Sequence, residues 1–226
     1  MAKKTNAGRI KVLGAFLLLF GPAFLLIFIS SRGCEHKFKE LEDYGKATEY
    51  HFIDAAGKKR KAKEFRNKVV LVTTIQETCP DSCAIRLWNL NQAIYQHIRK
   101  NKKKLKQVVI ISFATDGFGK PLKDLSTIQK ALFDQIEGYD PNIWILANGD
   151  SETLYDFENN KNRLLQEGDE YFGGKSYQEL MLLLDKQNHL RMVLSGKTEG
   201  MIRRMKEHIA LLQKEYDKKA YQSKKK

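Results

Sequence analysis

Two cysteines four positions apart, Cys79 and Cys83, are the residues whose type and spacing point most directly to chemistry. They belong to the run Thr-Cys-Pro-Asp-Ser-Cys, residues 78–83, which lies between a β-branched stretch and a stretch with helical spacing. At the start of a helix, backbone amides and the helix dipole favour a thiolate. Two thiolates at this spacing can close a disulfide or hold a soft cation such as Cu(I). The alternative interpretation is an inert thiol pair or a purely structural disulfide.

The other cysteine, Cys34, is the only one left for a larger site. A structural zinc site needs four ligands, usually from two pairs, so the cysteine count argues against zinc.

Periodicity predicts the elements that would position the cysteine pair. Residues 68–75 have the pattern of a buried strand, and apolar residues follow the cysteine loop at helical spacing over 84–100. A second buried strand at 107–114 and a helix at 126–136, with Ser126 as its N-cap, imply a parallel pair with a right-handed crossover. Further strands are predicted at 143–147, 179–185 and 190–194, then a final helix at 198–216. With a hairpin over 49–63 that turns at Gly57, the pattern indicates an α/β, thioredoxin-like fold.

Asp116 directly follows the second parallel strand. The carboxyl ends of parallel strands share one edge of a sheet, so we expect Asp116 to lie near the cysteine loop. It is a candidate for tuning a thiol or docking a partner. The alternative is a cap for the turn at Gly117.

The N-terminal region contains twenty consecutive residues without a charge, 12–31. A helix of that length is about 30 Å long, which predicts one transmembrane anchor. Lysines and arginines before it place the N-terminus in the cytoplasm and the domain in the periplasm or outside, with the lipid bilayer as a partner. A cleaved signal peptide or lipoprotein processing at Cys34 are alternatives, against which the length of the run and Arg32 argue.

This segment and the charge pattern give the predicted domain organisation. It consists of a cytoplasmic tail (1–11), the anchor (12–31), a linker (32–44), the thioredoxin-like domain (45–216) and a lysine-rich disordered tail (217–226). The net charge is +13, but the lysines lie in separated clusters without a recognisable nucleic-acid motif. We therefore expect no nucleic-acid partner.

The order of strand, Thr-Cys-Pro-Asp-Ser-Cys, helix and a strand that ends in Ala114-Thr115-Asp116 resembles the Sco/SenC family of copper metallochaperones and thiol–disulfide proteins. The likeness covers residues 44–216, and Cys79, Pro80, Asp81 and Cys83 are its most specific part. It implies a thioredoxin-like fold with an early hairpin, one membrane helix and a Cu(I) ion bound by the two cysteines. It also implies a client, the subunit of cytochrome c oxidase that carries the dinuclear copper site.

One position departs from the family pattern. In the family a histidine shortly before the penultimate strand completes a Cys-Cys-His copper site, and counting back from Asp185 puts Tyr177 there. The five histidines lie elsewhere in the sequence: His36, His51, His97, His189 and His208. Unless His51 reaches the cysteines, Cu(I) would have two sulfur ligands and an unknown third.

The predicted function is that of a Sco-like accessory protein. It would use the cysteine pair for thiol–disulfide exchange, Cu(I) handling or both, and Tyr177 favours the thiol chemistry. One alternative is a membrane-tethered thiol–disulfide or peroxide-reducing enzyme without copper, although no proline stands just before the strand at 179, where thioredoxin-type reductases have one. The other is a binding module with an inert disulfide.

Overall fold

The computed structural model describes residues 6–33, 40–77, 81–155, 158–159, 162–163, 170–171 and 174–223. The chain divides into two compact units, Met1–Lys39 and Glu40–Lys226. The first contains helix α1 (Asn6–Gly33), and the second contains all the strands and the remaining helices.

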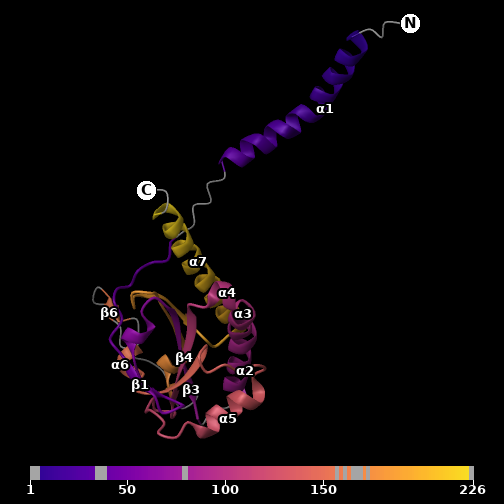
Figure 1. Ribbon diagram of the computed structural model, residues 1–226. Helices are drawn as coiled ribbons and strands as arrows, with labels where there is room; N and C mark the ends of the chain where they lie inside the picture. The colour runs from indigo at the N-terminus through magenta and orange to yellow at the C-terminus, as the bar shows by residue number, and fades with distance from the viewer. Residues whose placement is uncertain are drawn as a thin grey trace. The chain divides into compact units, whose positions relative to one another are not determined.

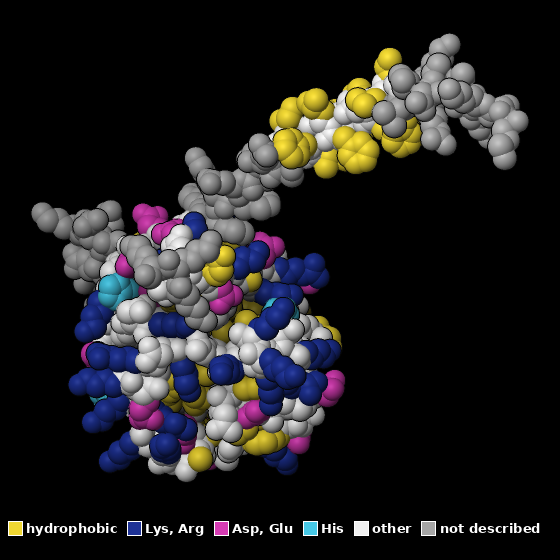
Figure 2. Space-filling model, turned by 45° about the horizontal axis from the view of Figure 1, so that its top comes forward, with side chains coloured by type: hydrophobic (Ala, Val, Ile, Leu, Met, Phe, Trp, Pro, Cys, Tyr) yellow, Lys and Arg dark blue, Asp and Glu magenta, His cyan; other side chains and the backbone are white. Residues whose placement is uncertain are grey.

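Helix α1 corresponds to the predicted anchor. Its hydrophobic side chains are largely exposed, among them Leu18, Phe24 and Leu26 (Figure 2). However, no helix in the described part of the chain is long and apolar enough to cross a membrane. The prediction of a single-pass inner-membrane protein with a transmembrane helix over 12–31 is therefore wrong.

The second unit is built on a seven-stranded sheet with the order β11-β10-β3-β4-β5-β1-β2 (Figure 1). β3, β4 and β5 are parallel, and the other pairs are antiparallel. The strands are β1 (His51–Asp54), β2 (Lys59–Lys61), β3 (Val69–Gln76), β4 (Val108–Thr115), β5 (Trp144–Asn148), β10 (Leu180–Leu184) and β11 (Leu190–Ser195). Four two-residue strands form two small ribbons apart from this sheet: β6 (Glu158–Asn159) with β7 (Asn162–Arg163), and β8 (Glu170–Tyr171) with β9 (Gly174–Lys175). The predicted mixed α/β, thioredoxin-like sheet with an early hairpin is confirmed.

The helices follow the predicted order, and two of their predicted ends, at Ser126 and after residue 216, need correction. The helical stretch after the cysteine loop consists of α2 (Asp81–Leu90), a π-helical turn η2 (Asn91–Tyr95) and α3 (Gln96–Lys100). The others are η1 (Ala62–Phe65), α4 (Lys102–Leu105), α5 (Ser126–Gln135), α6 (Glu152–Tyr155), η3 (Ser176–Glu179) and α7 (Glu199–Ser223). Ser126 is the first helical residue rather than the N-cap, and its amide bonds to the Asp124 carboxylate at 2.9 Å. α7 continues to Ser223, so the predicted disorder from residue 217 is wrong for residues 217–223.

The central strands are buried on both faces, as their continuous apolar runs predict. Val69 and Leu71 pack on one face of the sheet with apolar residues of α2, α3, α5 and α7. Val70 and Val72 pack on the other face, where Phe52, Phe65 and Tyr155 lie. Figure 1 shows α2, α3 and α5 on one side of the sheet and α6 on the other. The parallel strands are thereby held rigidly, and their carboxyl ends form one edge.

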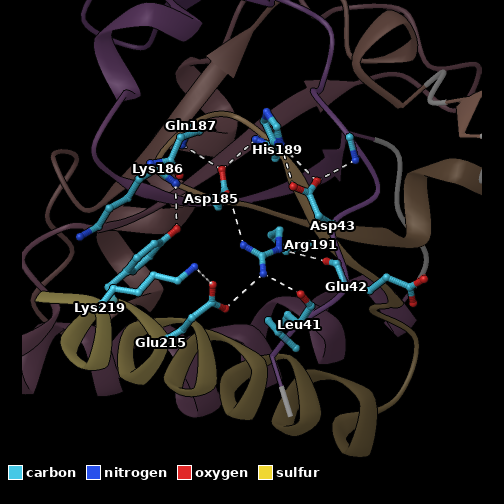
Figure 3. Close-up of polar contacts among 12 residues, drawn as sticks. Leu41, Glu42, Asp43, Asp185, Lys186, Gln187, His189, Arg191, Glu215 and Lys219 are labelled. Carbon is cyan, nitrogen blue, oxygen red and sulfur yellow. Dashed lines mark hydrogen bonds and ion pairs between the residues drawn. The ribbon is translucent and has the colours of Figure 1, made fainter. Parts of the chain in front are cut away.

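Residues 41–47 run along the start of β11. The Arg191 guanidinium donates to the carbonyls of Leu41 (2.6 Å) and Glu42 (3.0 Å), and its other contacts are the buried carboxylates of Asp185 and Glu215, both at 3.1 Å (Figure 3). His189 Nδ1 lies at hydrogen-bond distance, 2.9 Å, from a carboxylate oxygen of Asp43. Residues 41–44 of the predicted linker are thus bonded to the domain. They lie at the end of the sheet where β3 begins, opposite to its carboxyl end.

Candidate functional site

The cysteine loop connects the carboxyl end of β3 with α2. β3 and β4 are parallel, and Gln76 pairs with Thr115 at the end of both strands. The amide of Glu77 donates to the carbonyl of Thr115 at 3.0 Å, so the pairing continues up to the loop. α2 begins at Asp81, which puts Cys83 in its first turn. The amides of a first turn have no intrahelical acceptor, and together with the helix dipole they favour a thiolate.

The chemistry of the two cysteines stays a prediction. Cys79 lies outside the described residues, within 78–80, and only the backbone of Cys83 is described. The disulfide and the Cu(I) pair are therefore expectations from the sequence. Cys34 also lies outside the described residues.

Asp116 lies one residue beyond the pairing of Thr115 with Gln76, at the carboxyl end of β4. Its carboxylate Oδ1 accepts hydrogen bonds from the amides of Phe118 and Lys120, both at 2.8 Å. The amide of Gly119 donates to the Asp116 carbonyl at 3.2 Å, and Gly119 has a φ of +85°. The carboxylate thus stabilises this turn, as the alternative interpretation holds, and a role of Asp116 in thiol chemistry stays a prediction.

Tyr177 is buried at the same edge of the sheet, with 6% of its surface exposed. It belongs to η3, which precedes β10, and its hydroxyl lies 3.4 Å from Ser151 Oγ and 3.4 Å from the carbonyl oxygen of Gly119. Burial raises the pKa of Tyr177 to about 12, and the nearby carboxylates of Glu152, Asp150 and Asp116 act in the same direction. The phenol is therefore neutral at physiological pH. The assignment of Tyr177 to the position of the family histidine stays a prediction.

Next to Tyr177, the fully buried Gln178 joins the ends of β3 and β4 to α2. Its backbone carbonyl accepts hydrogen bonds from the Thr74 hydroxyl and from Arg86 Nη1, the latter at 2.7 Å. Arg86 Nη2 also donates to the carbonyl of Thr74 at 3.3 Å. The Gln178 side chain bonds to Thr115 Oγ1 at 2.6 Å and to the carbonyl of Gly117 at 2.9 Å. These contacts fix the elements that flank the cysteine loop.

Sequence reasoning missed Arg86 and Gln178. Arg86 follows Cys83 by three positions and faces the same side of α2, which is the one signal that could have drawn attention to it. No local pattern marks Gln178, because its partners Thr74 and Thr115 lie 104 and 63 positions away.

The described histidines lie in three different places. β1 is antiparallel to β5, so His51 lies at the cysteine-loop edge of the sheet, but β4 and β5 separate its strand from β3. His189 lies at the opposite edge, and His97 and His208 lie on α3 and α7. His36 is outside the described residues. Among the residues that are described, no group of three or more His, Cys, Asp and Glu side chains could hold a metal ion.

Solved structures resemble this fold at low sequence identity. A SCO1/SenC family lipoprotein from Bacillus anthracis str. Ames is 23% identical, with a TM-score of 0.50, and the match covers 73% of this chain and 95% of that chain. A putative protein disulfide isomerase from Bacteroides thetaiotaomicron is 15% identical, with a TM-score of 0.51, over 78% and 95% of the two chains. Yeast Sco1 with copper bound is 14% identical, with a TM-score of 0.49, over 74% and 89%. None of the curated proteins matches this chain.

The match to a family model is more specific than these likenesses. The SCO1/SenC model matches residues 39–210, which include β3, the cysteine loop, α2 and the whole of η3. The match therefore covers most of the second unit, and this chain belongs to the SCO1/SenC family.

Proposed function

We propose that this chain exchanges disulfides with a client protein through Cys79 and Cys83, and that the client is a copper-site subunit of cytochrome c oxidase. The observation that carries the proposal is the place of Cys83 in the first turn of a helix that follows a buried parallel strand. Helix amides and the dipole lower the pKa of a thiol there, and the thiolate is the attacking form. Family membership supports the choice of client.

The exchange needs no further reactant. The thiolate of one cysteine attacks the client disulfide, a mixed disulfide forms, and one client thiolate leaves. The second cysteine then attacks the mixed disulfide and releases the other client thiolate. The client gains two electrons and its two thiolates take up protons, while Cys79 and Cys83 become a disulfide.

Cu(I) is the second candidate substrate of the same pair, because two thiolates suit a soft monovalent cation. A stable three-ligand site is less well supported than thiol exchange. The residue at the cysteine-loop edge that precedes β10 is Tyr177, whose neutral phenol is a poor ligand for Cu(I). We therefore propose transient copper handling at most, with two sulfur ligands and an unassigned third.

The test is a pair of measurements on the reduced full-length protein. We expect a disulfide-bridged peptide from the copper site of the client to oxidise Cys79 and Cys83, detected by alkylation and mass spectrometry. We expect Cu(I) to be lost readily to a competing chelator. The Cys79→Ser/Cys83→Ser variant is the control for both.

Two results would change the proposal. An unreactive wild-type pair would remove thiol exchange as the function. Tight one-to-one Cu(I) binding that the double variant loses would make copper delivery the main function, and His51 the first residue to test as third ligand.

A further inference from the structure

A cavity of about 240 Å³ lies beside the cysteine loop. One wall is the end of β3 with the residue after it, residues 74–77, and a second wall is α2, including Ala84 and Leu87. The third wall is α5, which Figure 1 shows close to the start of α2. Two of its walls are therefore the two elements that the cysteine loop connects.

The interior of the cavity is mainly apolar. Leu90, Ile128 and Leu132 belong to the hydrophobic core, and Ala131 lies half-buried beside them. Apolar cavities of about 150 Å³ bind benzene, so this one has room for a leucine, methionine or phenylalanine side chain. Burial of such a side chain away from water would stabilise the encounter.

The charges around the cavity favour a neutral side chain with a basic neighbour. Arg86 lines the cavity, but its two terminal nitrogens donate to the carbonyls of Gln178 and Thr74, so it is already engaged. Glu77 is exposed at the end nearest to the loop. A positive charge on the occupant would complement Glu77, one of the acidic residues in a protein whose net charge is +13.

We propose that this cavity binds a large apolar side chain of the client segment that carries the disulfide, with a basic residue next to that side chain. The inference rests on the proposed thiol exchange and adds a specificity subsite to it. Because the walls of the cavity flank the cysteine loop, a side chain in it holds the adjacent client cysteine close to the attacking thiolate.

The probes are synthetic peptides with one internal disulfide. They differ next to one cysteine, where they carry Leu-Arg, Ser-Arg or Leu-Glu. The reduced full-length protein is mixed with each peptide, and each rate is divided by the rate with cystamine, which is too small to report on the subsite. We expect the Leu-Arg peptide to react about tenfold faster than the Ser-Arg peptide and severalfold faster than the Leu-Glu peptide.

Substitutions that fill the cavity should remove this preference. Ala131→Phe fills it from α5, and Thr127→Trp covers its mouth from an exposed position, which keeps the test valid if the first variant does not fold. We expect both variants to lower the cystamine-normalised rate of the Leu-Arg peptide to that of the Ser-Arg peptide. Glu77→Gln should abolish the preference for Arg over Glu. The matched control is Ala93→Phe, in the separate groove between η2 and α7.

The results separate this inference from the function on which it rests. Normal cystamine reduction with equal ratios for all peptides, or with ratios unchanged in Ala131→Phe and Thr127→Trp, would overturn the subsite alone. Failure to reduce cystamine or any peptide would overturn the proposed function. A dimer of the wild-type protein that Ala131→Phe dissociates would show that a second copy fills the cavity, which also overturns the inference.

Discussion

At the residue scale, Tyr177 is the residue that the sequence predicts at the position of the family's copper-ligand histidine. Its hydroxyl is close to Ser151 and Gly119, and its ring packs against Tyr155 with centroids 5.2 Å apart. A buried neutral phenol in these surroundings offers Cu(I) a hard and weak ligand. An imidazole at the same position would offer a better one.

We predict that Tyr177→His raises the Cu(I) affinity of the reduced full-length protein at least tenfold, because the imidazole supplies a third ligand. Competition with a Cu(I) chelator measures the change. Tyr177→Phe, which only removes the hydroxyl, should leave the affinity as it is. An equal affinity of the histidine variant and wild type would mean that Tyr177 does not occupy the ligand position.

Gly119 is the residue that lets Tyr177 pack so closely. Its φ of +85° is strained for other residues, and a Cβ there would collide with the Tyr177 hydroxyl. We predict that Gly119→Ala lowers the free energy of unfolding by about 2–3 kcal/mol, measured by urea denaturation. In the Tyr177→Phe background the loss should be smaller, since the hydroxyl is gone. An equal loss in both backgrounds would assign the whole cost to the backbone.

Sequence reasoning was most informative for single residues where local spacing matters. It singled out Cys79 and Cys83 because strand, loop and helix follow one another in the chain, and it located Asp116 because a strand ends there. It did not find the contacts of Arg86 and Gln178, since each depends on which distant loops the fold brings together. The carboxylate of Asp116 serves its own turn, a detail that spacing cannot distinguish from a role in chemistry.

At the element scale, the buried strands were predictable because continuous β-branched runs have few other stable environments. Helix ends were less predictable. Lysine content suggested disorder from residue 217, but Lys219 pairs with Glu215 one turn earlier at 2.6 Å, and the helix continues to Ser223. The helical stretch 81–100 contains a π-helical turn that no sequence pattern indicated.

The contacts of Arg191 join three elements: residues 41–42, β11 and α7 (Figure 3). We predict that Arg191→Met lowers the free energy of unfolding by about 3–5 kcal/mol, because the buried carboxylates of Asp185 and Glu215 both lose the guanidinium and Glu215 keeps only its ion pair with the exposed Lys219. It should also speed amide hydrogen exchange in residues 41–47. Urea denaturation and exchange mass spectrometry measure the two effects.

The control for this prediction is Arg203→Met. Arg203 pairs with Glu199 on the exposed face of α7, where both side chains are more than half exposed. We expect a loss below about 1 kcal/mol there. Similar losses for the two variants would contradict a special role of the buried ion pairs.

At the scale of the whole molecule, lysine and arginine are spread along the sequence in separated clusters. Figure 2 shows lysine and arginine side chains distributed over the visible face of the second unit, which agrees with the expectation of separated clusters. A distributed positive charge favours solubility and long-range attraction of acidic surfaces rather than one binding site. Titratable groups inside the fold also contribute to the pH dependence of stability.

His208 on α7 is the clearest of these groups. Both ring nitrogens are buried without a hydrogen-bond partner among the described residues. Burial lowers the pKa of His208, the neighbouring Arg204 lowers it further, and Glu207 opposes them. The pKa of His97 on α3 is also lowered, by burial and by the nearby Lys206.

A histidine with a lowered pKa in the folded state destabilises the fold in acid, because the unfolded chain takes up the proton first. Above the unfolded pKa of about 6.5 both states are neutral and the histidine has no effect. As the pH falls below that value, the free energy of unfolding should decrease until the folded protein is also protonated. We predict that His208→Leu reduces the loss of stability between pH 7.5 and pH 5.5, measured by urea denaturation at both values. His51→Gln, at an exposed position on β1, is the control, and an unchanged loss in His208→Leu would show that other groups carry the pH dependence.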